Sequence, residues 1–464
     1  HLTSLALTLR LAPLASASSF DDVIHILSQF KKDNHLKDGD WIVGFGYDHN
    51  NLKEHLHPTK DILDKVSTSN PILISHVSGH MGCMNSAALE KAGITSDTPN
   101  PSGGVIGRIG ETREPNGYLE ENAFISMTTL VPEPSLEELS QLIVKAQEIY
   151  FSFGIATIQE GLIKENQFHI LNYAAQSKKL KADVIGYVDL KESKHIFSKH
   201  PEYDGKYENG LKLAGYKIFL DGSPQGKTAW LSAPYASSSD GYRGYPIYSD
   251  EEVLSFCETA LRENRQLLAH CNGDAAAEQF ISCMEKASAG CLGADIRPVM
   301  IHAQTVRPDQ LERMKRVGML PSFFIAHTYY WGDIHLKNLG RERAEAISPA
   351  QSAKKINLPF TFHQDTPVLP PNMMETVWCA VNRRTQSGRL LGEKERISVL
   401  DALKAVTIYA AYQYGEDAVK GSIEEGKVAD LVILDQNPLK ICTDDLKRVQ
   451  VLSLYKRGEL VFEK

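Results

Sequence analysis

Residues 266–270 read QLLAH and residues 298–302 read PVMIH, two short apolar runs that each end in a histidine. Such runs are typical of buried strands, here with one polar residue at the carboxyl end. Amphipathic segments with apolar residues three and four apart lie around and between them, at 250–264, 275–287 and 308–316. The alternation predicts a parallel sheet whose strands are connected by helices. Five more runs continue the series, at 155–159, 183–188, 214–220, 319–323 and 360–363.

The spacing of these seven strands predicts a (β/α)8 TIM-type barrel. Lys217 and Asp365 are 148 residues apart (365 − 217) over four strand-to-strand steps, which is 37 residues per step. A barrel of roughly 250 residues needs about 31 per step before insertions. An eighth strand is therefore expected at the front. The step from His1 to Ile155 covers 154 residues (155 − 1), which predicts a large insertion after that strand, at about 20–150.

The end of the chain has a different pattern from the barrel. A helical segment at 399–414 is followed by strand-like runs at 428–434, 449–454 and 459–462. Short strands without intervening helices predict a small β-domain. We therefore expect a barrel over residues 1–415, with its insertion, and the C-terminal part of a β-domain over 416–464.

Composition excludes several classes of protein. The formal charge is −8, and the longest basic runs are pairs such as Lys31-Lys32, which argues against a nucleic-acid partner. Seven cysteines without close CxxC pairs favour a reducing compartment. No run approaches the roughly 18 apolar residues of a membrane span. We expect a cytoplasmic protein with a small-molecule substrate, with a homodimer as the assembly to test.

Four polar residues interrupt apolar strands near their carboxyl ends. Lys217 interrupts the run at 214–220, His270 and His302 stand at the ends of the next two runs, and Asp365 shares one strand face with Thr361 and His363. Active sites of barrels lie at the carboxyl ends of the strands, and imidazole with carboxylate ligands is typical of zinc sites. Taken singly, a strand-end histidine is more often structural, and Lys217 could pair with Asp221. Their coincidence on successive strands favours a metal site.

Several motifs resemble one known family. They are WIVGFGYD at 41–48, Gly79-His80 with NSAAL at 85–89, Lys217 with Asp221-Gly222, His270 with Gly273-Asp274, His302-Ala303-Gln304, Gln364-Asp365-Thr366-Pro367, and KGSI at 420–423 with GKVADL at 426–431. Together they resemble the amidohydrolase superfamily, and in particular its YtcJ-like branch, which includes N-substituted formamide deformylases. In that superfamily the chain end returns into a β-sandwich domain.

The resemblance implies a set of metal ligands. His1, Lys217, His270, His302 and Asp365 would hold one or two divalent ions, most simply zinc, although iron and manganese accept the same ligands. His1 resembles the second histidine of a pair, whose first member would lie upstream together with the first strands of the β-sandwich. Lys217 is a candidate for carboxylation on its amine. Asp365 would be both ligand and proton shuttle.

Other residues are candidates for substrate contact. Glu160 follows a predicted strand, His80 lies in the insertion, and His327 and Trp331 belong to an aromatic stretch after the seventh strand. A surface or structural role competes evenly with substrate binding for these residues, and also for His76 and His335.

The function that the sequence favours is hydrolysis of a non-peptide C–N bond, in an N-formyl, N-acyl or related amide, by metal-activated hydroxide. A metal-dependent deaminase or cyclic amidase uses the same attack and stays open. A catalytically silent barrel that binds a small molecule is the alternative outside enzymes. The presence of Lys217, His270, His302 and Asp365 together argues against it.

Overall fold

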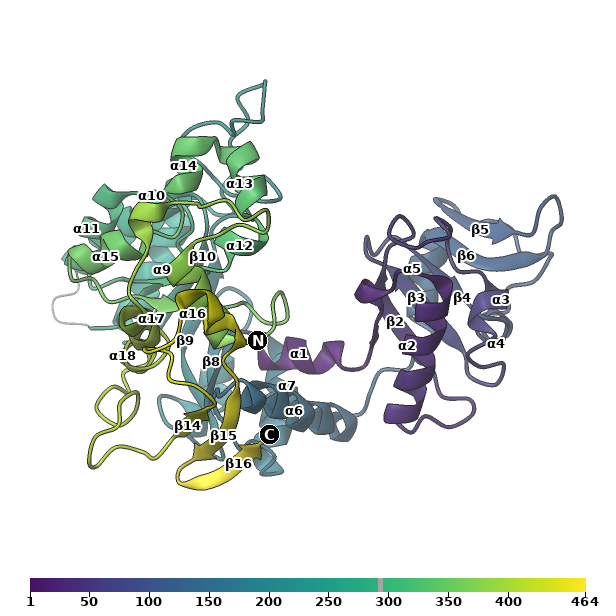
Figure 1. The fold of residues 1–464 in the computed structure, drawn as a ribbon, viewed down its shortest axis with the longest axis horizontal. Helices are drawn as coiled ribbons and strands as arrows, with labels where there is room; N and C mark the ends of the chain where they lie inside the picture. Colours follow the sequence, from purple (N-terminus) through teal and green to yellow (C-terminus); the bar gives the residue numbers. More distant parts are fainter. Residues whose placement is uncertain (291–294) are drawn as a thin grey trace. The chain divides into compact units, whose positions relative to one another are not determined.

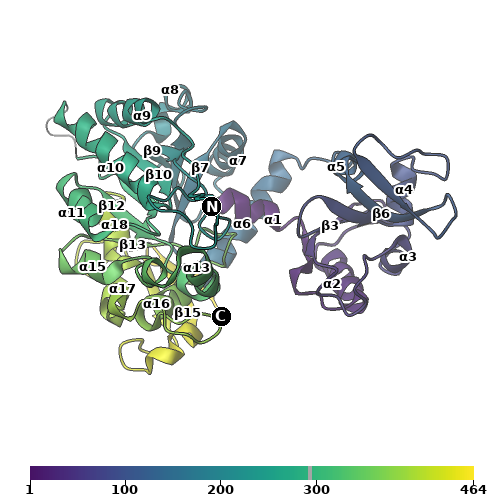
Figure 2. The same cartoon turned by 90° about the horizontal axis from the view of Figure 1, so that it is seen from above.

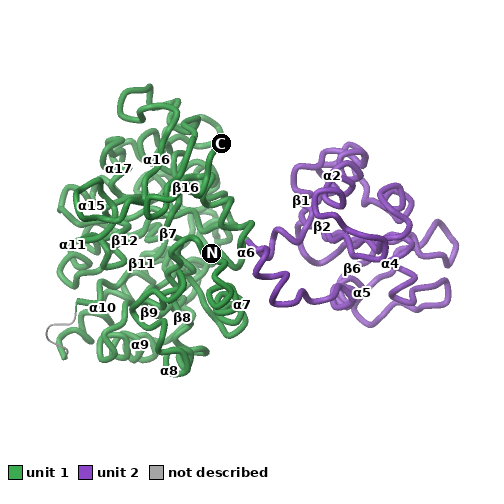
Figure 3. The backbone as a smooth tube through the Cα atoms, turned by 90° about the horizontal axis from the view of Figure 1, so that it is seen from below, with its two compact units in different colours: residues 1–5, 143–464 green, residues 6–142 purple. Residues whose placement is uncertain are grey.

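The computed structural model describes residues 1–290 and 295–464, which divide into two compact units (Figure 3). The large unit consists of residues 1–5 and 143–464, and the small unit consists of residues 6–142. The small unit spans most of the segment in which the insertion is expected. Each unit has its own sheet, so each is described by itself.

A seven-stranded parallel sheet forms the centre of the large unit, in the order β13-β12-β11-β10-β9-β8-β7. All seven predicted strands are confirmed, with ends shifted by a few residues. In the described part of the chain the eighth strand is not found in this sheet, which ends at β7 and β13. The strands are β7 (Thr157–Ile163), β8 (Asp183–Asp189), β9 (Leu211–Phe219), β10 (Gln266–Cys271), β11 (Val299–His302), β12 (Leu320–Phe323) and β13 (Thr361–Phe362).

Helices connect these strands and lie outside the curled sheet, with α9, α10, α11 and α15 on its outer side in Figure 2. The predicted helix at 308–316 is observed with those bounds, whereas the one at 399–414 is broken into two at Thr407. Two helices, α1 (Leu2–Thr8) and α6 (Leu136–Ser152), each begin in one unit and end in the other. The other helices of this unit are α7 (Glu165–Gln176), α8 (Ile196–Lys199), α9 (Asp250–Arg262), α10 (Asp274–Ala289), α11 (Pro308–Arg316), α12 (His327–Tyr330), α13 (Gly332–Leu339), α14 (Arg341–Glu345), α15 (Ala350–Lys355), α16 (Met373–Asn382), α17 (Val399–Ala405) and α18 (Ile408–Gln413).

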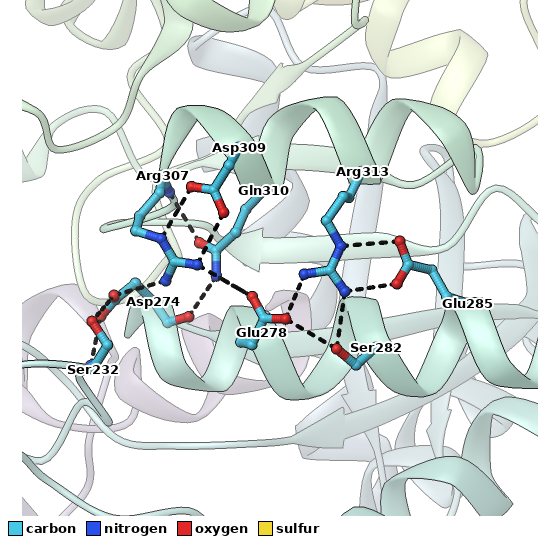
Figure 4. Close-up of polar contacts among 9 residues, drawn as sticks. All are labelled: Ser232, Asp274, Glu278, Ser282, Glu285, Arg307, Asp309, Gln310 and Arg313. Atoms are coloured by element: carbon cyan, nitrogen blue, oxygen red, sulfur yellow. Dashed lines mark hydrogen bonds and ion pairs between the residues drawn. The ribbon is translucent and has the colours of Figure 1, made fainter.

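Charged side chains tie α10 to α11 (Figure 4). Arg313 donates to Glu285 at 2.6 Å and also bonds Glu278, while Arg307 donates to Asp274 at 3.0 Å. Asp274 in turn accepts a hydrogen bond from the backbone of Ser232 at 2.9 Å. The network therefore fixes the loop after β9, which borders the carboxyl end of the sheet.

The end of the chain forms a three-stranded antiparallel sheet of β14 (Leu431–Leu434), β15 (Val451–Lys456) and β16 (Glu459–Glu463), in yellow in Figure 1. It attaches to the amino end of β8 through buried charges. Asp183, the first residue of β8, accepts hydrogen bonds from Lys420 at 2.5 Å and from Lys456 at 2.7 Å. These ion pairs lie at the opposite end of the strand from the predicted site.

The small unit has a six-stranded mixed sheet in the order β1-β2-β3-β4-β6-β5, in which β1, β2 and β3 are parallel. Its strands are β1 (Ala12–Pro13), β2 (Ile42–Tyr47), β3 (Ile72–His76), β4 (Met81–Met84), β5 (Gly104–Arg108) and β6 (Pro115–Glu121). Its helices are α2 (Phe20–Asp33), α3 (Lys60–Leu63), α4 (Ser86–Lys91) and α5 (Asn122–Thr128). Leu14, Val23 and Leu27 form part of the core between α2 and the sheet.

No helix within residues 1–290 and 295–464 is long and apolar enough to cross a membrane.

Candidate metal centre

A cavity of about 190 Å³ opens in the large unit among the strands β7, β9, β10, β11 and β13. The predicted ligands meet there. The polar residues that line it include His1, Lys217, His270, His302, His363 and Asp365. Because the strands are parallel, their carboxyl ends converge on one side of the sheet, which explains why residues far apart in the chain share one cavity.

Lys217 is buried on β9 without a charged partner. Its side chain is 5% exposed, and its Nζ lies 5.3 Å from the centre of the Phe219 ring. In the described part of the chain Nζ makes no hydrogen bond and no ion pair within 4.0 Å. Burial lowers the pKa of Lys217 to about 8, against a smaller opposing effect of Asp365. About a tenth of the amine is therefore neutral at pH 7.

Three histidines form a continuous chain along the cavity. His270 Nδ1 lies 3.0 Å from His302 Nε2, and His302 Nδ1 lies 3.1 Å from His363 Nε2. Ser322 Oγ lies 3.0 Å from His363 Nδ1 and ends the chain. Burial lowers the pKa of His270 and of His363 to about 4, so both rings are neutral at pH 7. Neutral imidazole is the form that binds metal ions.

Two carboxylates flank the imidazole of His1. Glu160 Oε1 lies 3.0 Å from His1 Nδ1, and Asp365 Oδ1 lies 3.4 Å from His1 Nε2. Burial lowers the pKa of His1, but the two carboxylates outweigh it and raise the value to about 9. Burial likewise opposes ionisation of Asp365, yet His1 and His302 hold the pKa of Asp365 well below its usual range. Glu160 and Asp365 therefore favour a positively charged group between them.

Asp221 organises the backbone around the site and does not pair with Lys217. Its carboxylate accepts hydrogen bonds from the backbone nitrogens of Trp230 at 2.9 Å, Asn272 at 2.9 Å and Gly273 at 2.7 Å. Burial raises the pKa of Asp221 to about 7 against these three bonds. The alternative in which Lys217 is a structural partner of Asp221 is therefore wrong.

The other predicted contact residues have different surroundings. Glu160 lies inside β7 and not after it, and it also accepts from Thr3 N at 2.7 Å. The ring of His327 lies tilted against that of Trp331, with centroids 4.5 Å apart, and it stacks on the ring of His335, whose Nε2 lies 3.0 Å from His327 Nδ1. Phe324 connects this group to the cavity because its ring lies 5.2 Å from His363.

His80 belongs to the small unit, where its imidazole is exposed and lies 3.1 Å from Glu121 Oε2.

The cavity residues fit a divalent metal by their chemistry. The neutral imidazoles of His270 and His363 and the ionised carboxylate of Asp365 are donors that a zinc centre accepts. The ring nitrogens of His270, His302 and His363 contact one another at 3.0 and 3.1 Å, and a bound metal would replace these contacts. Lys217 fits a carbamate in particular, because an unpartnered neutral amine is the form that takes up carbon dioxide.

Two features were not predicted from the sequence. His363 joins the histidine chain directly, although its alternation with Asp365 indicates only a shared strand face. Asp48, His49 and His76 form a compact group in the small unit whose ligand atoms all lie within 4.8 Å of one another. They come together through the pairing of β2 with β3, for which the sequence has no local signal.

Comparisons with known proteins extend over nearly the whole chain. A family model described as "Amidohydrolase family" matches residues 1–462. The chain is 28% identical over 474 residues to Protein LONG AFTER FAR-RED 3 of Arabidopsis thaliana, covering 100% of this chain and 80% of that protein. It is 26% identical to the putative amidohydrolase YtcJ of Bacillus subtilis, with 97% and 85% coverage, and 26% identical to the N-substituted formamide deformylase of Arthrobacter pascens, with 97% and 83% coverage.

Among solved structures, an uncharacterized metal-dependent hydrolase from Pyrococcus horikoshii OT3 matches with a TM-score of 0.72 and 25% identity. The match covers 96% of this chain and 85% of that one.

Proposed function

The chain belongs to the amidohydrolase family, in its YtcJ-like branch, and on this premise we propose that it hydrolyses a non-peptide C–N bond at a divalent metal centre. The substrate class that we propose is an N-formyl, N-acyl or related small amide, and zinc is the metal. The observation that carries the proposal is the convergence of Lys217, His270, His302 and Asp365 on one cavity. The deformylase of Arthrobacter pascens supports the choice of substrate class.

Within this proposal each residue has a role that follows from its surroundings. His270, His302 and Asp365 would hold the metal together with His1, whose imidazole has a pKa of about 9 and must first lose its proton, and Lys217 would join them as a carbamate. A pKa of about 8 leaves about 10% of the Lys217 amine neutral at pH 7, against about 0.03% at the ordinary value of 10.5. Burial of Lys217 thus raises the reactive fraction by more than two orders of magnitude.

When bound, a divalent metal lowers the pKa of water to about 7 and polarises a carbonyl oxygen. Asp365 then has the proton-transfer role, because its carboxylate is ionised and lies in the same cavity as the imidazoles. It accepts the proton of the attacking water and returns it to the leaving nitrogen. The ring of Phe324 contacts His363 of the histidine chain and also the rings of His327 and Trp331, so aromatic side chains adjoin the site, which suits an apolar substituent on the substrate.

The test is metal content together with formate release. The purified chain is analysed for bound metals and assayed with N-substituted formamides and N-acyl amines, beside Lys217→Ala and the exposed control Lys206→Ala. We expect bound zinc and turnover in the parent chain, loss of both in Lys217→Ala, and no change in Lys206→Ala.

Metal that is unaffected by Lys217→Ala would contradict the carbamate role and favour a deaminase-like centre. A metal-free, inactive parent chain would contradict the proposal and favour the silent binding protein.

A further inference from the structure

A second group of metal-binding side chains lies wholly within the small unit. Asp48 and His49 directly follow β2, and His76 is the last residue of β3. The two strands are parallel neighbours, with Tyr47 in register with His76. Ligand sites of open α/β sheets form beyond the carboxyl ends of such strands, which is where these three residues meet.

The three ligand atoms have the spacing of a metal coordination sphere. His49 Nδ1 lies 3.3 Å from His76 Nε2, Asp48 Oδ1 lies 3.5 Å from His76 Nε2, and Asp48 Oδ1 lies 3.8 Å from His49 Nδ1. The point equidistant from the corners of this triangle is about 2.0 Å from each, which matches Zn–N and Zn–O bonds of about 2.0–2.2 Å. Adjacent ligands of a zinc tetrahedron are roughly 3.3 Å apart by the same bond lengths.

Neighbouring groups orient the ligands. Asp48 Oδ1 accepts from the backbone and side-chain nitrogens of Asn50, both at 2.9 Å, and these bonds lower the pKa of Asp48. Ser78 Oγ lies 2.9 Å from His76 Nδ1 and can accept its proton, which frees Nε2 for a metal. In the metal-free ring Ser78 N donates to the same Nδ1 at 3.1 Å. A proton on Nδ1 would break that bond, so metal binding at Nε2 would exchange it for the bond to Ser78 Oγ.

A third ring supports the group from the side. The His57 ring lies 4.2 Å from that of His49 and stacks on Tyr118 at 4.3 Å. His57 Nδ1 lies 2.9 Å from the hydroxyl of Tyr47. Its contacts hold His49 in place. Asp48 and His49 are half-buried while His76 is buried, so solvent can reach the site from one side.

We propose that Asp48, His49 and His76 form a second binding site for a divalent transition metal, independent of the cavity in the large unit. Two imidazoles and one carboxylate favour zinc, nickel or copper over magnesium and calcium. Three protein ligands leave a coordination position for water or an exogenous ligand. Bound metal would also join the ends of β2 and β3.

The experiment uses zinc and the full chain. After removal of metals, parent and variant chains are equilibrated with buffered Zn²⁺, desalted and analysed for zinc. His49→Asn is the main variant because His49 is half-buried, and His25→Asn, an exposed histidine of α2, is the matched control. Two further chains carry Lys217→Ala and His270→Asn, which disable the large-unit cavity. One of them also carries His49→Asn.

We expect His49→Asn to lose about one zinc per chain and His25→Asn to lose none. The chain with the disabled cavity should still bind about one zinc, and adding His49→Asn should abolish it. Equal zinc content in the parent chain and in His49→Asn would overturn the proposal. This outcome does not depend on the result for the Lys217 variants, so failure of the second-site proposal can be distinguished from failure of the proposed function.

A measurement on the unmodified chain covers the case in which a variant misfolds. Exchange of the imidazole C2 proton, followed by mass spectrometry, is slowed when a ring binds a metal. Zinc should slow exchange at His49 and His76 and leave His25 unchanged. Unchanged exchange at His49 and His76 in saturating zinc would also overturn the proposal.

Discussion

Replacing Asp183 with Asn should destabilise the large unit, because this carboxylate is the centre of a buried ion-pair cluster. Its side chain is 4% exposed and accepts hydrogen bonds from Lys420 at 2.5 Å and Lys456 at 2.7 Å. An amide of the same size keeps the shape but removes the charge. Both lysines would remain buried, with Glu416 and Asp430 as their remaining acidic partners at 2.8 and 2.7 Å.

The magnitude follows from the pKa of Asp183. Burial raises that pKa, but Lys420 and Lys456 outweigh it and bring it to about 2 from 3.8. A difference of about 2 pKa units is worth about 2–3 kcal/mol. Breaking a buried pair by removing one partner costs about 3–5 kcal/mol, and the remaining partners of the lysines reduce this. We expect Asp183→Asn to lower the free energy of unfolding by about 2–3 kcal/mol at pH 7.

The assay is urea unfolding followed by circular dichroism, beside Glu424→Gln as control. Glu424 loses the same charge, but its side chain is 65% exposed and lies 3.9 Å from Lys427, so about 0.5 kcal/mol or less is expected. Because the folded-state pKa of Asp183 is lowered, its contribution is complete above about pH 4 and is lost as pH falls toward 2. Equal stability of Asp183→Asn and Glu424→Gln at pH 7 would refute the reasoning.

Three further predictions concern the site and its support. Asp365→Asn should reduce turnover by about 10²–10⁴-fold through loss of proton transfer, and a less than tenfold effect in steady-state kinetics would contradict that role. Zinc uptake by the metal-depleted chain should increase with added bicarbonate and as pH rises toward 8, because deprotonation of Lys217 supplies the reactive amine. Atomic absorption measures the bound zinc, and zinc uptake that does not change with bicarbonate would exclude the carbamate. Arg313→Met should lower the free energy of unfolding, measured with urea, by about 1 kcal/mol, because its partners Glu278 and Glu285 are only partly exposed. An unchanged free energy of unfolding would mean that the network in Figure 4 has no net effect on stability.

The parallel sheet could be predicted from sequence because buried parallel strands are short, continuous apolar runs. Helix α11 begins at Pro308 and ends at Arg316 as predicted, since proline at its start and basic residues in its last turn are local signals. The expected helix at 399–414 is interrupted at Thr407, whose backbone leaves the helical region. Apolar periodicity continues across that break and does not reveal it.

The site was predictable to the extent that it depends on strand ends. Lys217, His270 and His302 each follow an apolar run, and parallel strands bring such positions together. The contact between His302 and His363 depends on side-chain direction at the end of β11. The meeting of His49 with His76 depends on strand register across 27 residues (76 − 49). Neither the side-chain direction nor the strand register is encoded in a local sequence pattern, so neither contact was predicted.

Two of the proposed ligands in the large unit, and Ala303 beside one of them, have left-handed backbone. His302, Ala303 and Asp365 have φ values of 75°, 45° and 55°, in the left-handed region, and each such residue costs of order 1 kcal/mol or more.

Left-handed backbone and desolvation thus occur together at the carboxyl ends of β11 and β13, while the ion pairs of Asp183 stabilise the amino end of β8. Packing of the sheet does not require the strained conformations, since a strand can end without them. The left-handed conformations are explained if the side chains must point toward a common position. A cation bound at that position would then offset the conformational free energy that they cost. The same reasoning applies to the unpartnered amine of Lys217, which is unfavourable as a buried cation and favourable as a ligand.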